Sequence, residues 1–119
     1  MSVTERRNYQ RVKTQNELSY VCIDDRGKPT ERRMGTAIEI SQGGLFMETH
    51  NPLKPKDALL ITIDIKGELV PIKGRVVHCR TDDSGKSRTG IQFLEFNEKI
   101  LSFVTSLIKT YSEFINQHG

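Results

Sequence analysis

The 119-residue sequence lacks tryptophan and has only two cysteines, Cys22 and Cys79. Small secreted domains often depend on several disulfides, so two cysteines fit reduced, buried thiols better than a disulfide framework. Aromatic residues make up 7% of the chain, and most of them fall on faces that the sequence pattern assigns to a core. Barrels that bind single-stranded nucleic acid need exposed aromatic side chains along a basic groove, so this class is disfavoured.

Long apolar runs are absent as well. No segment approaches the ~18 consecutive apolar residues of a transmembrane helix, and the first residues lack the apolar stretch of a secretory signal. We therefore expect a soluble, cytoplasmic protein with no membrane insertion. The chain is close in length to a typical domain of ~150 residues, which allows one core without a metal or a disulfide.

Residue groupings typical of an active site or a metal site are also missing. His50, His78 and His118 are scattered, and no cluster of His, Cys or Asp has metal-ligand spacing. His78 and Cys79 are adjacent, so in a strand they would face opposite sides. Ser41 lacks the surroundings of a catalytic nucleophile. The sequence therefore predicts that the protein is not an enzyme and has no cofactor or metal site.

The excess of positive charge is confined to one end of the chain. The formal net charge is +3, and it comes entirely from residues 1–13, because the remaining basic and acidic side chains balance. Duplex-binding domains spread Lys and Arg over a broad face to neutralise many phosphates. We expect no DNA partner. The pattern predicts a flexible cationic arm over residues 1–13 and a folded domain over residues 14–119.

The folded domain has the pattern of an all-β protein followed by one helix. About six short strands with turn residues between them predict an antiparallel barrel or sandwich, and a barrel would leave no exposed edges. Pro71 and Gly74 suggest an edge or a bulge within one strand. The expected strands cover residues 17–23, 34–40, 45–49, 59–65, 69–80 and 87–96.

Apolar residues change to a helical period after Asn97, which is a good N-cap, so we expect a helix over about residues 97–116. Phe103 and Phe114 lie off the main apolar stripe and either widen the core face or mark a contact with a partner. The stripe consists of Ile100, Val104, Leu107, Ile108, Tyr111 and Ile115.

Two segments carry the candidate binding chemistry. In the arm, Arg7 and Arg11 are four residues apart, so both guanidinium groups can address one phosphate or guanine. At the end of the second strand, Glu39 and Ser41 would project outward together while Ile38 and Ile40 point to the core. Gly43 and Gly44 follow and would allow positive φ and close approach of the backbone to a ligand. Taken separately, the arginine pair is more typical of a solvated tail, and the second segment is equally compatible with a solvated hairpin end.

Together the two segments resemble the ligand-binding signature of the PilZ domain family, R-x-x-x-R followed by [D/N]-x-S-x-x-G. Arg7 and Arg11 match the first part, Ser41 and Gly44 match the second, and Glu39 occupies the Asp/Asn position. The opening at residues 6–12 and the sequence Gly-Ile-Gln-Phe at residues 90–93 also resemble that family. The resemblance implies a six-stranded antiparallel β-barrel with a C-terminal helix that binds the bacterial second messenger cyclic di-GMP.

The resemblance also implies a role for each site residue. Arg7 and Arg11 would contact guanine edges and phosphates, while Glu39 and Ser41 would hold a guanine edge beside the backbone of Gly43 and Gly44. Ligand binding would fold the arm onto the barrel, and a downstream protein, for example in motility or exopolysaccharide synthesis, would read the new surface. Arg6 is either a stacking partner for a second ligand molecule or a solvated charge. Because the carboxylate of Glu39 reaches one methylene further than that of Asp, a degenerate adaptor that binds only proteins is the alternative.

Overall fold

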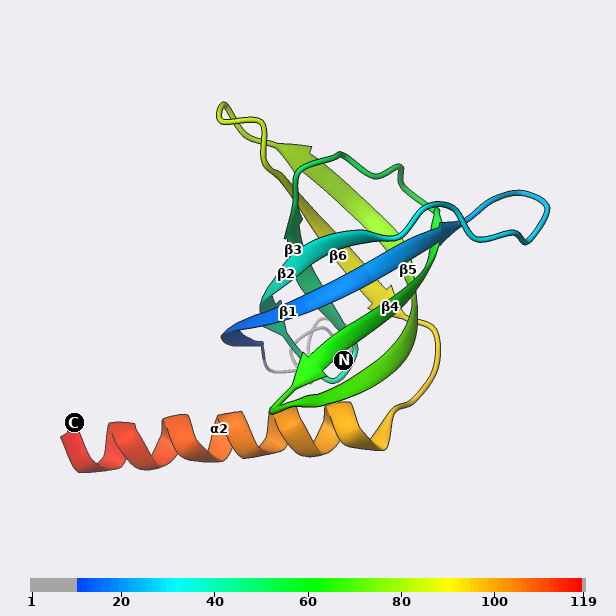
Figure 1. Ribbon diagram of the computed structural model, residues 1–119. Coiled ribbons are helices and arrows are strands. Elements are labelled where there is room, and N and C mark those ends of the chain that lie inside the picture. The colour runs from blue at the N-terminus through cyan, green and yellow to red at the C-terminus, as the bar shows by residue number, and fades with distance from the viewer. Residues whose placement is uncertain (1–10, 119) are drawn as a thin grey trace, which may run out of the picture.

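The structure is a computed structural model that describes the backbone of residues 11–118 and the side chains of residues 11–109. Six antiparallel strands form a closed barrel, and a helix follows them (Figure 1). This architecture confirms the fold predicted from the sequence. The elements are β1 (Val12–Ile23), β2 (Arg33–Ile40), β3 (Gly44–Thr49), β4 (Ala58–Ile65), β5 (Glu68–Thr81), β6 (Ser87–Phe93) and α2 (Glu98–His118).

The order of strands around the barrel is β1-β2-β3-β6-β5-β4, so β1 closes the barrel by pairing with both β2 and β4. β1 begins at Val12, earlier than expected, because Val12 pairs with Ile40 and Lys13 pairs with Glu39. Residues 12 and 13, which we assigned to the cationic arm, are therefore part of the first strand. This pairing brings the start of β1, directly after Arg11, alongside the end of β2.

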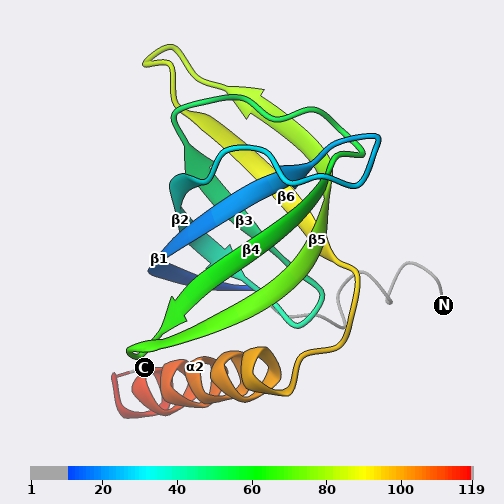
Figure 2. The same cartoon turned by 45° about the vertical axis from the view of Figure 1, so that its right-hand side comes forward.

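Side chains that alternate along the strands fill the interior. On β4, Leu59, Ile61 and Ile63 are almost completely buried, as the period-2 pattern predicts. α2 lies across one end of the barrel and adds Ile100, Phe103 and Val104 to the same core (Figure 2). Phe103 is thus a core residue, whereas the side chain of Phe114 lies outside the described residues.

Asn97 both caps the start of α2 and bonds it to β5. The Asn97 Oδ1 accepts a hydrogen bond from the backbone N–H of Ile100 at 3.0 Å, which confirms the predicted N-cap. The Asn97 side-chain amide also donates to the carbonyl of Pro71 at 3.3 Å. Pro71 lies in the first half of β5, which pairs with β4 but not with β6. A proline is tolerated there because no β6 carbonyl needs its missing N–H.

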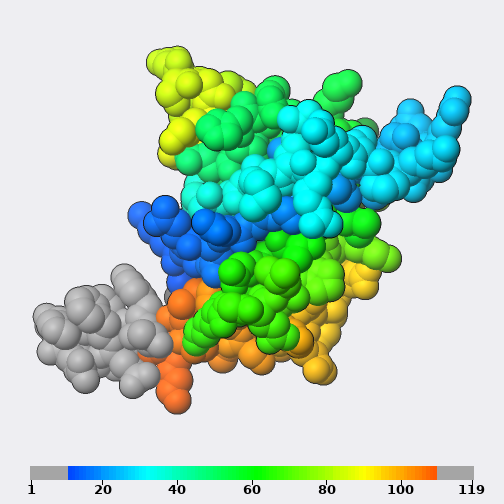
Figure 3. Space-filling view, viewed as in Figure 1, coloured from blue at the N-terminus to red at the C-terminus, as the bar shows by residue number. Residues whose placement is uncertain are grey.

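Long connections stand out from the barrel body. Figure 3 shows that the loop after β1 and the turn between β5 and β6 project from the body of the molecule. In the turn after β5, Asp82 accepts hydrogen bonds from the backbone of Ser84 and Lys86, and the first of these lies at 2.9 Å. Hydrogen bonds between Asp24 and the backbone of Arg26 and Lys28 order the loop after β1 in the same way. Both connections are therefore self-contained turns.

Candidate functional site

Two β-bulges shape the outer face of the barrel where β2, β3, β6 and β5 lie side by side. In β2, Ile38 and Glu39 both oppose Phe46, so the inward residues are Ala37 and Ile40. The expectation that Ile38 points into the core is therefore wrong, because a bulge interrupts the alternation of the strand. Ile38 instead lines a cavity on the outer surface.

Glu39 is one of two acidic residues that line this face, and Arg11 is its ion-pair partner. The Arg11 Nη1 lies 3.5 Å from the Glu39 Oε1, which is an ion-pair distance and too long for a good hydrogen bond. This carboxylate oxygen is buried and has no hydrogen-bond partner among the described residues. Because Arg11 is well exposed, with 66% of its side chain accessible, the pair adds at most about 1 kcal/mol to stability. A ligand with suitable donors can therefore displace it at little cost.

Ser41 holds the turn between β2 and β3. Its backbone N–H donates to the carbonyl of Gly44 at 2.8 Å, and its Oγ accepts from the N–H of Gly43 at 3.2 Å. The Ser41 hydroxyl lies 3.3 Å from the Gly44 carbonyl, to which it donates. The serine of the second motif thus fixes the backbone that carries the two glycines. Direct contact of Ser41 with a ligand stays a prediction.

Gly44 is required for close packing of two strands. A Cβ at Gly44 would lie 2.1 Å from the carbonyl oxygen of Ile91 on β6, far inside van der Waals contact. Among the described glycines, positive φ occurs at residues 27, 67 and 85, so the expectation of positive φ at Gly43 and Gly44 is wrong. The physical reason is that Gly44 is already a paired strand residue, opposite Gln92. Because Gly44 has no side chain, the backbone of β6 can lie close to it.

Phe46 and His78 form part of this face, although neither belongs to a sequence motif. Their ring centroids lie 5.3 Å apart with an interplanar angle of 39°. A second bulge, in β5, places both Val77 and His78 opposite Gly90 and turns them outward. The sequence pattern assigned most aromatics to the core, but Phe46 lies on the outer side of β3. Only the cross-strand register brings these residues together.

Two adjoining surface cavities cover this face. One, of about 620 Å³, is lined by Arg11, Ser41, Gly43 and Gly44 together with residues of β5 and β6. The other, of about 810 Å³, extends toward Lys13 and the far ends of β5 and β6. They share the residues Glu39, Phe46 and His78.

The charges around these two cavities favour a small anion. Four basic side chains and two acidic ones line them, which leaves a surplus of two positive charges. One of the carboxylates, Glu48, is neutralised by ion pairs with Lys86 and Arg88 at 3.8 and 3.3 Å. The basic residues that line the cavities are Arg11, Lys13, Arg80 and Arg88.

The structure therefore brings together the predicted residues Arg11, Glu39, Ser41, Gly43 and Gly44. The predicted residues Arg6 and Arg7 lie outside the described part of the chain. Sequence reasoning missed Phe46 and His78, because their proximity depends on strand order and on the bulge in β5.

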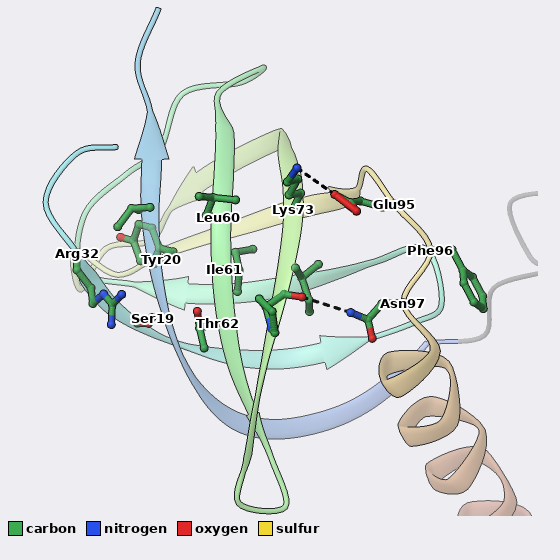
Figure 4. A pocket seen from close by; sticks show the side chains of 13 residues that line it. Ser19, Tyr20, Arg32, Leu60, Ile61, Thr62, Lys73, Glu95, Phe96 and Asn97 are labelled. Atoms are coloured by element: carbon green, nitrogen blue, oxygen red, sulfur yellow. Dashed lines mark hydrogen bonds and ion pairs between the residues drawn. The ribbon is translucent and has the colours of Figure 1, made fainter. Parts of the chain in front are cut away.

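A separate cavity of about 410 Å³ lies over β1, β4 and β5 (Figure 4). Three of its polar residues are paired within the protein, since Lys73 pairs with Glu95 at 3.3 Å and Asn97 is bonded to Pro71. Among the residues that the structure describes, no member of either sequence motif lines it. We therefore place the candidate site on the β2–β3–β6–β5 face.

Neither a metal site nor a membrane-spanning helix is found within the described part of the chain. No three His, Cys, Asp or Glu side chains there converge as metal ligands. Among residues 11–118, no helix has the combined length and apolar character needed to cross a bilayer. Cys22 and Cys79 are both free and half-buried, as expected for reduced thiols.

Comparison with known proteins places this fold and its motifs in one family. The family model of the PilZ domain matches residues 5–109. The inhibitor of motility MotI/DgrA from Bacillus subtilis is similar, with a TM-score of 0.73 and 16% identity. The alignment covers 91% of this chain and 52% of MotI/DgrA, so the chain spans about half the length of that protein.

Isolated PilZ domains align over nearly their whole length. The PilZ domain of YcgR from Escherichia coli, solved with c-di-GMP, has a TM-score of 0.66 and 12% identity, covering 93% of this chain and 98% of that domain. The PilZ domain of CeSA from a cellulose-synthesizing bacterium has a TM-score of 0.59 and 15% identity, covering 86% and 98%. No curated protein matches the sequence. The match of the family model over most of the chain shows that this protein belongs to the PilZ domain family.

Proposed function

We propose that this protein is a bacterial cyclic di-GMP receptor, in which the ligand lies over the β2–β3–β6–β5 face and is held by the N-terminal arginines. The observation that carries the proposal is the Glu39 carboxylate, which is buried at Oε1, lacks a hydrogen-bond partner among the described residues and faces a surface cavity beside Arg11. The YcgR domain, which has a similar fold, was solved with this nucleotide.

The chemistry of the face matches the chemistry of the ligand. A guanine presents its N1–H and N2–H₂ donors on one edge, and one carboxylate such as Glu39 can accept from both. The two phosphates of the ligand carry charge −2, which the surplus of two positive charges around the cavities balances. Arg11 can then exchange its long contact with Glu39 for a bidentate contact with phosphate or guanine.

Arginine variants test this proposal directly. Charge-assisted hydrogen bonds contribute about 1.5–3 kcal/mol each, so Arg7→Ala or Arg11→Ala should weaken cyclic di-GMP binding about 10- to 150-fold in calorimetry. Arg26→Ala is the matched control, because Arg26 lies in the exposed loop after β1 and lines neither cavity of the site. Binding of the wild type no tighter than about millimolar, or unchanged affinity in both variants, would contradict the receptor function.

Glu39 variants separate the receptor from the adaptor alternative. Glu39→Ala removes the acceptor and should also weaken binding about 10- to 150-fold. Glu39→Asp restores the residue type of the family motif and should retain binding. If neither the wild type nor Glu39→Asp binds cyclic di-GMP, the protein is an adaptor that acts only through protein contacts.

Output to a partner protein would follow from ordering of the arm. On this proposal, residues 5–11 fold over the ligand, and the covered face is what a downstream protein recognises. Amide hydrogen exchange of residues 5–11 should slow when cyclic di-GMP is added to the wild type and should stay unchanged in Arg11→Ala. Equal exchange with and without ligand in a protein that does bind would disprove the arm-folding mechanism. A calorimetric endpoint of one or two ligands per chain would show whether Arg6 supports a second molecule.

A further inference from the structure

The Phe46–His78 pair is an aromatic surface on the outside of the barrel that the core does not require. Inward neighbours of the pair, Leu45, Met47 and Val76, fill the interior beneath it. Phe46 is half-buried and His78 is exposed, and both rings line both cavities of the site. The pair therefore presents ring faces to any molecule that occupies these cavities.

Gly90 fixes the position of the His78 ring. It is the register partner of both Phe46 and His78, so it lies between them in the sheet. A Cβ at Gly90 would lie 2.9 Å from the His78 Cε1 and 3.1 Å from its Nε2, which shows that the imidazole rests directly against this glycine. The bulge at Val77 and His78 supplies the outward turn that this position needs. Strand pairing, bulge and glycine together hold the two rings against the sheet.

The aromatic pair is next to the carboxylate that reads a guanine edge. Glu39 is the register partner of Phe46 across β2 and β3, so one row of the sheet contains Glu39, Phe46, Gly90 and His78 in that order. A planar base on this row can place its edge against Glu39 and its face against the rings. Stacking on aromatic side chains binds any base, whereas the carboxylate distinguishes guanine from adenine, which has no N1–H donor.

We propose that Phe46 and His78 form the stacking surface for the guanine base whose edge is held by Glu39. This inference rests on the proposed receptor function. It assigns affinity to the ring faces and base selectivity to the carboxylate. It also explains why an aromatic pair, with a glycine beneath its histidine, occupies the outer face of a barrel whose core is already complete.

Calorimetry on four variants of the full chain tests the proposal. Loss of a stacking side chain typically weakens binding of a base by about 5- to 150-fold, so His78→Ala should weaken cyclic di-GMP binding by such a factor. His78→Phe keeps a ring and should retain most of the affinity. Phe46→Leu should weaken binding, while His50→Ala, an exposed histidine outside both cavities, should have no effect.

A second measurement does not depend on any substitution. In the NMR spectrum of the wild type, the ring protons of His78 and Phe46 should shift upfield on adding cyclic di-GMP, because a stacked guanine shields them. The proposal is overturned if His78→Ala and Phe46→Leu bind as tightly as the wild type while Arg11→Ala loses affinity, and in that case the receptor function stands. If the wild type does not bind cyclic di-GMP, both proposals fail together.

Discussion

A substitution at Gly44 tests whether the glycine of the second motif acts through strand packing. In Gly44→Ala, the new Cβ would meet the carbonyl oxygen of Ile91 at 2.1 Å and the carbonyl carbon at 3.2 Å. Both atoms belong to the backbone of a paired strand, so β3 and β6 must separate. The hydrogen bond from Phe93 N–H to Gly43 O, at 2.9 Å, resists that separation, and the bond from Ser41 N–H to Gly44 O, at 2.8 Å, holds Gly44 in the turn that precedes β3. Overpacking of this kind costs about 1–3 kcal/mol, occasionally more.

Gly74→Ala provides a matched comparison, because its new Cβ would also meet Ile91. There the new Cβ would meet the Ile91 Cγ2 at 2.4 Å, and this atom belongs to a side chain. Ile91→Ala removes the Cγ2 atom but keeps the carbonyl. In urea denaturation, the double variant Gly74→Ala with Ile91→Ala should therefore lose less free energy of unfolding than the sum of its two single variants, by about 0.5–3 kcal/mol. For Gly44→Ala with Ile91→Ala this difference should be much smaller.

Three results would refute this reasoning about Gly44. The first is a free energy of unfolding for Gly44→Ala within about 0.5 kcal/mol of the wild type. The second is equal coupling of both glycine variants to Ile91→Ala. The third is a variant with wild-type stability that no longer binds cyclic di-GMP, which would mean that the glycine serves the ligand directly.

Three further outcomes follow from single features of the structure. Asn97→Ala removes the cap of α2 and should lower the free energy of unfolding by about 1 kcal/mol in urea denaturation, and an unchanged value would argue against the cap. Burial raises the pKa of the Cys22 thiol above its ordinary value of 9.0 and that of the Tyr20 phenol above 10.0. As pH rises, the unfolded chain then releases these protons before the folded chain does. The free energy of unfolding should therefore keep its full value below about pH 9 and fall at higher pH, and a value that does not change with pH would contradict this. Arg80→Gln should weaken cyclic di-GMP binding more at low salt than at high salt, and a loss independent of salt would exclude a charge effect.

Much of the fold could be predicted from residue patterns. Alternation at Leu59, Ile61 and Ile63 gave a correct strand, and the helical period after Asn97 gave a correct helix with its cap. These signals are local, since the period of apolar residues depends on the geometry of one element. The start of β1 is harder to predict from the sequence. Val12 and Lys13 have polar neighbours in the chain, and they form a strand because they pair with β2.

The candidate site could be predicted only in part, because residue patterns are local and the site depends on pairing between strands far apart in the sequence. Glu39 and Ser41 were correctly placed at the end of a strand, but Ile38 was assigned to the core because alternation cannot reveal a bulge. The proximity of Phe46 to His78 depends on the order β3-β6-β5, which no local pattern contains. The role of Gly44 in packing likewise depends on Ile91, almost fifty residues later in the chain.

The bulges in β2 and β5 have a consequence for how this face can change in length. Each bulge adds one residue to the outer side of its strand, and the residues before and after the bulge still face inward. These inward residues are Ala37 and Ile40 in β2 and Val76 and Cys79 in β5. Deletion of Ile38 or Val77 would therefore remove an outward side chain and keep the core register. Insertions and deletions at these two points are a route by which the candidate binding face can diverge in shape while the barrel that supports it stays the same.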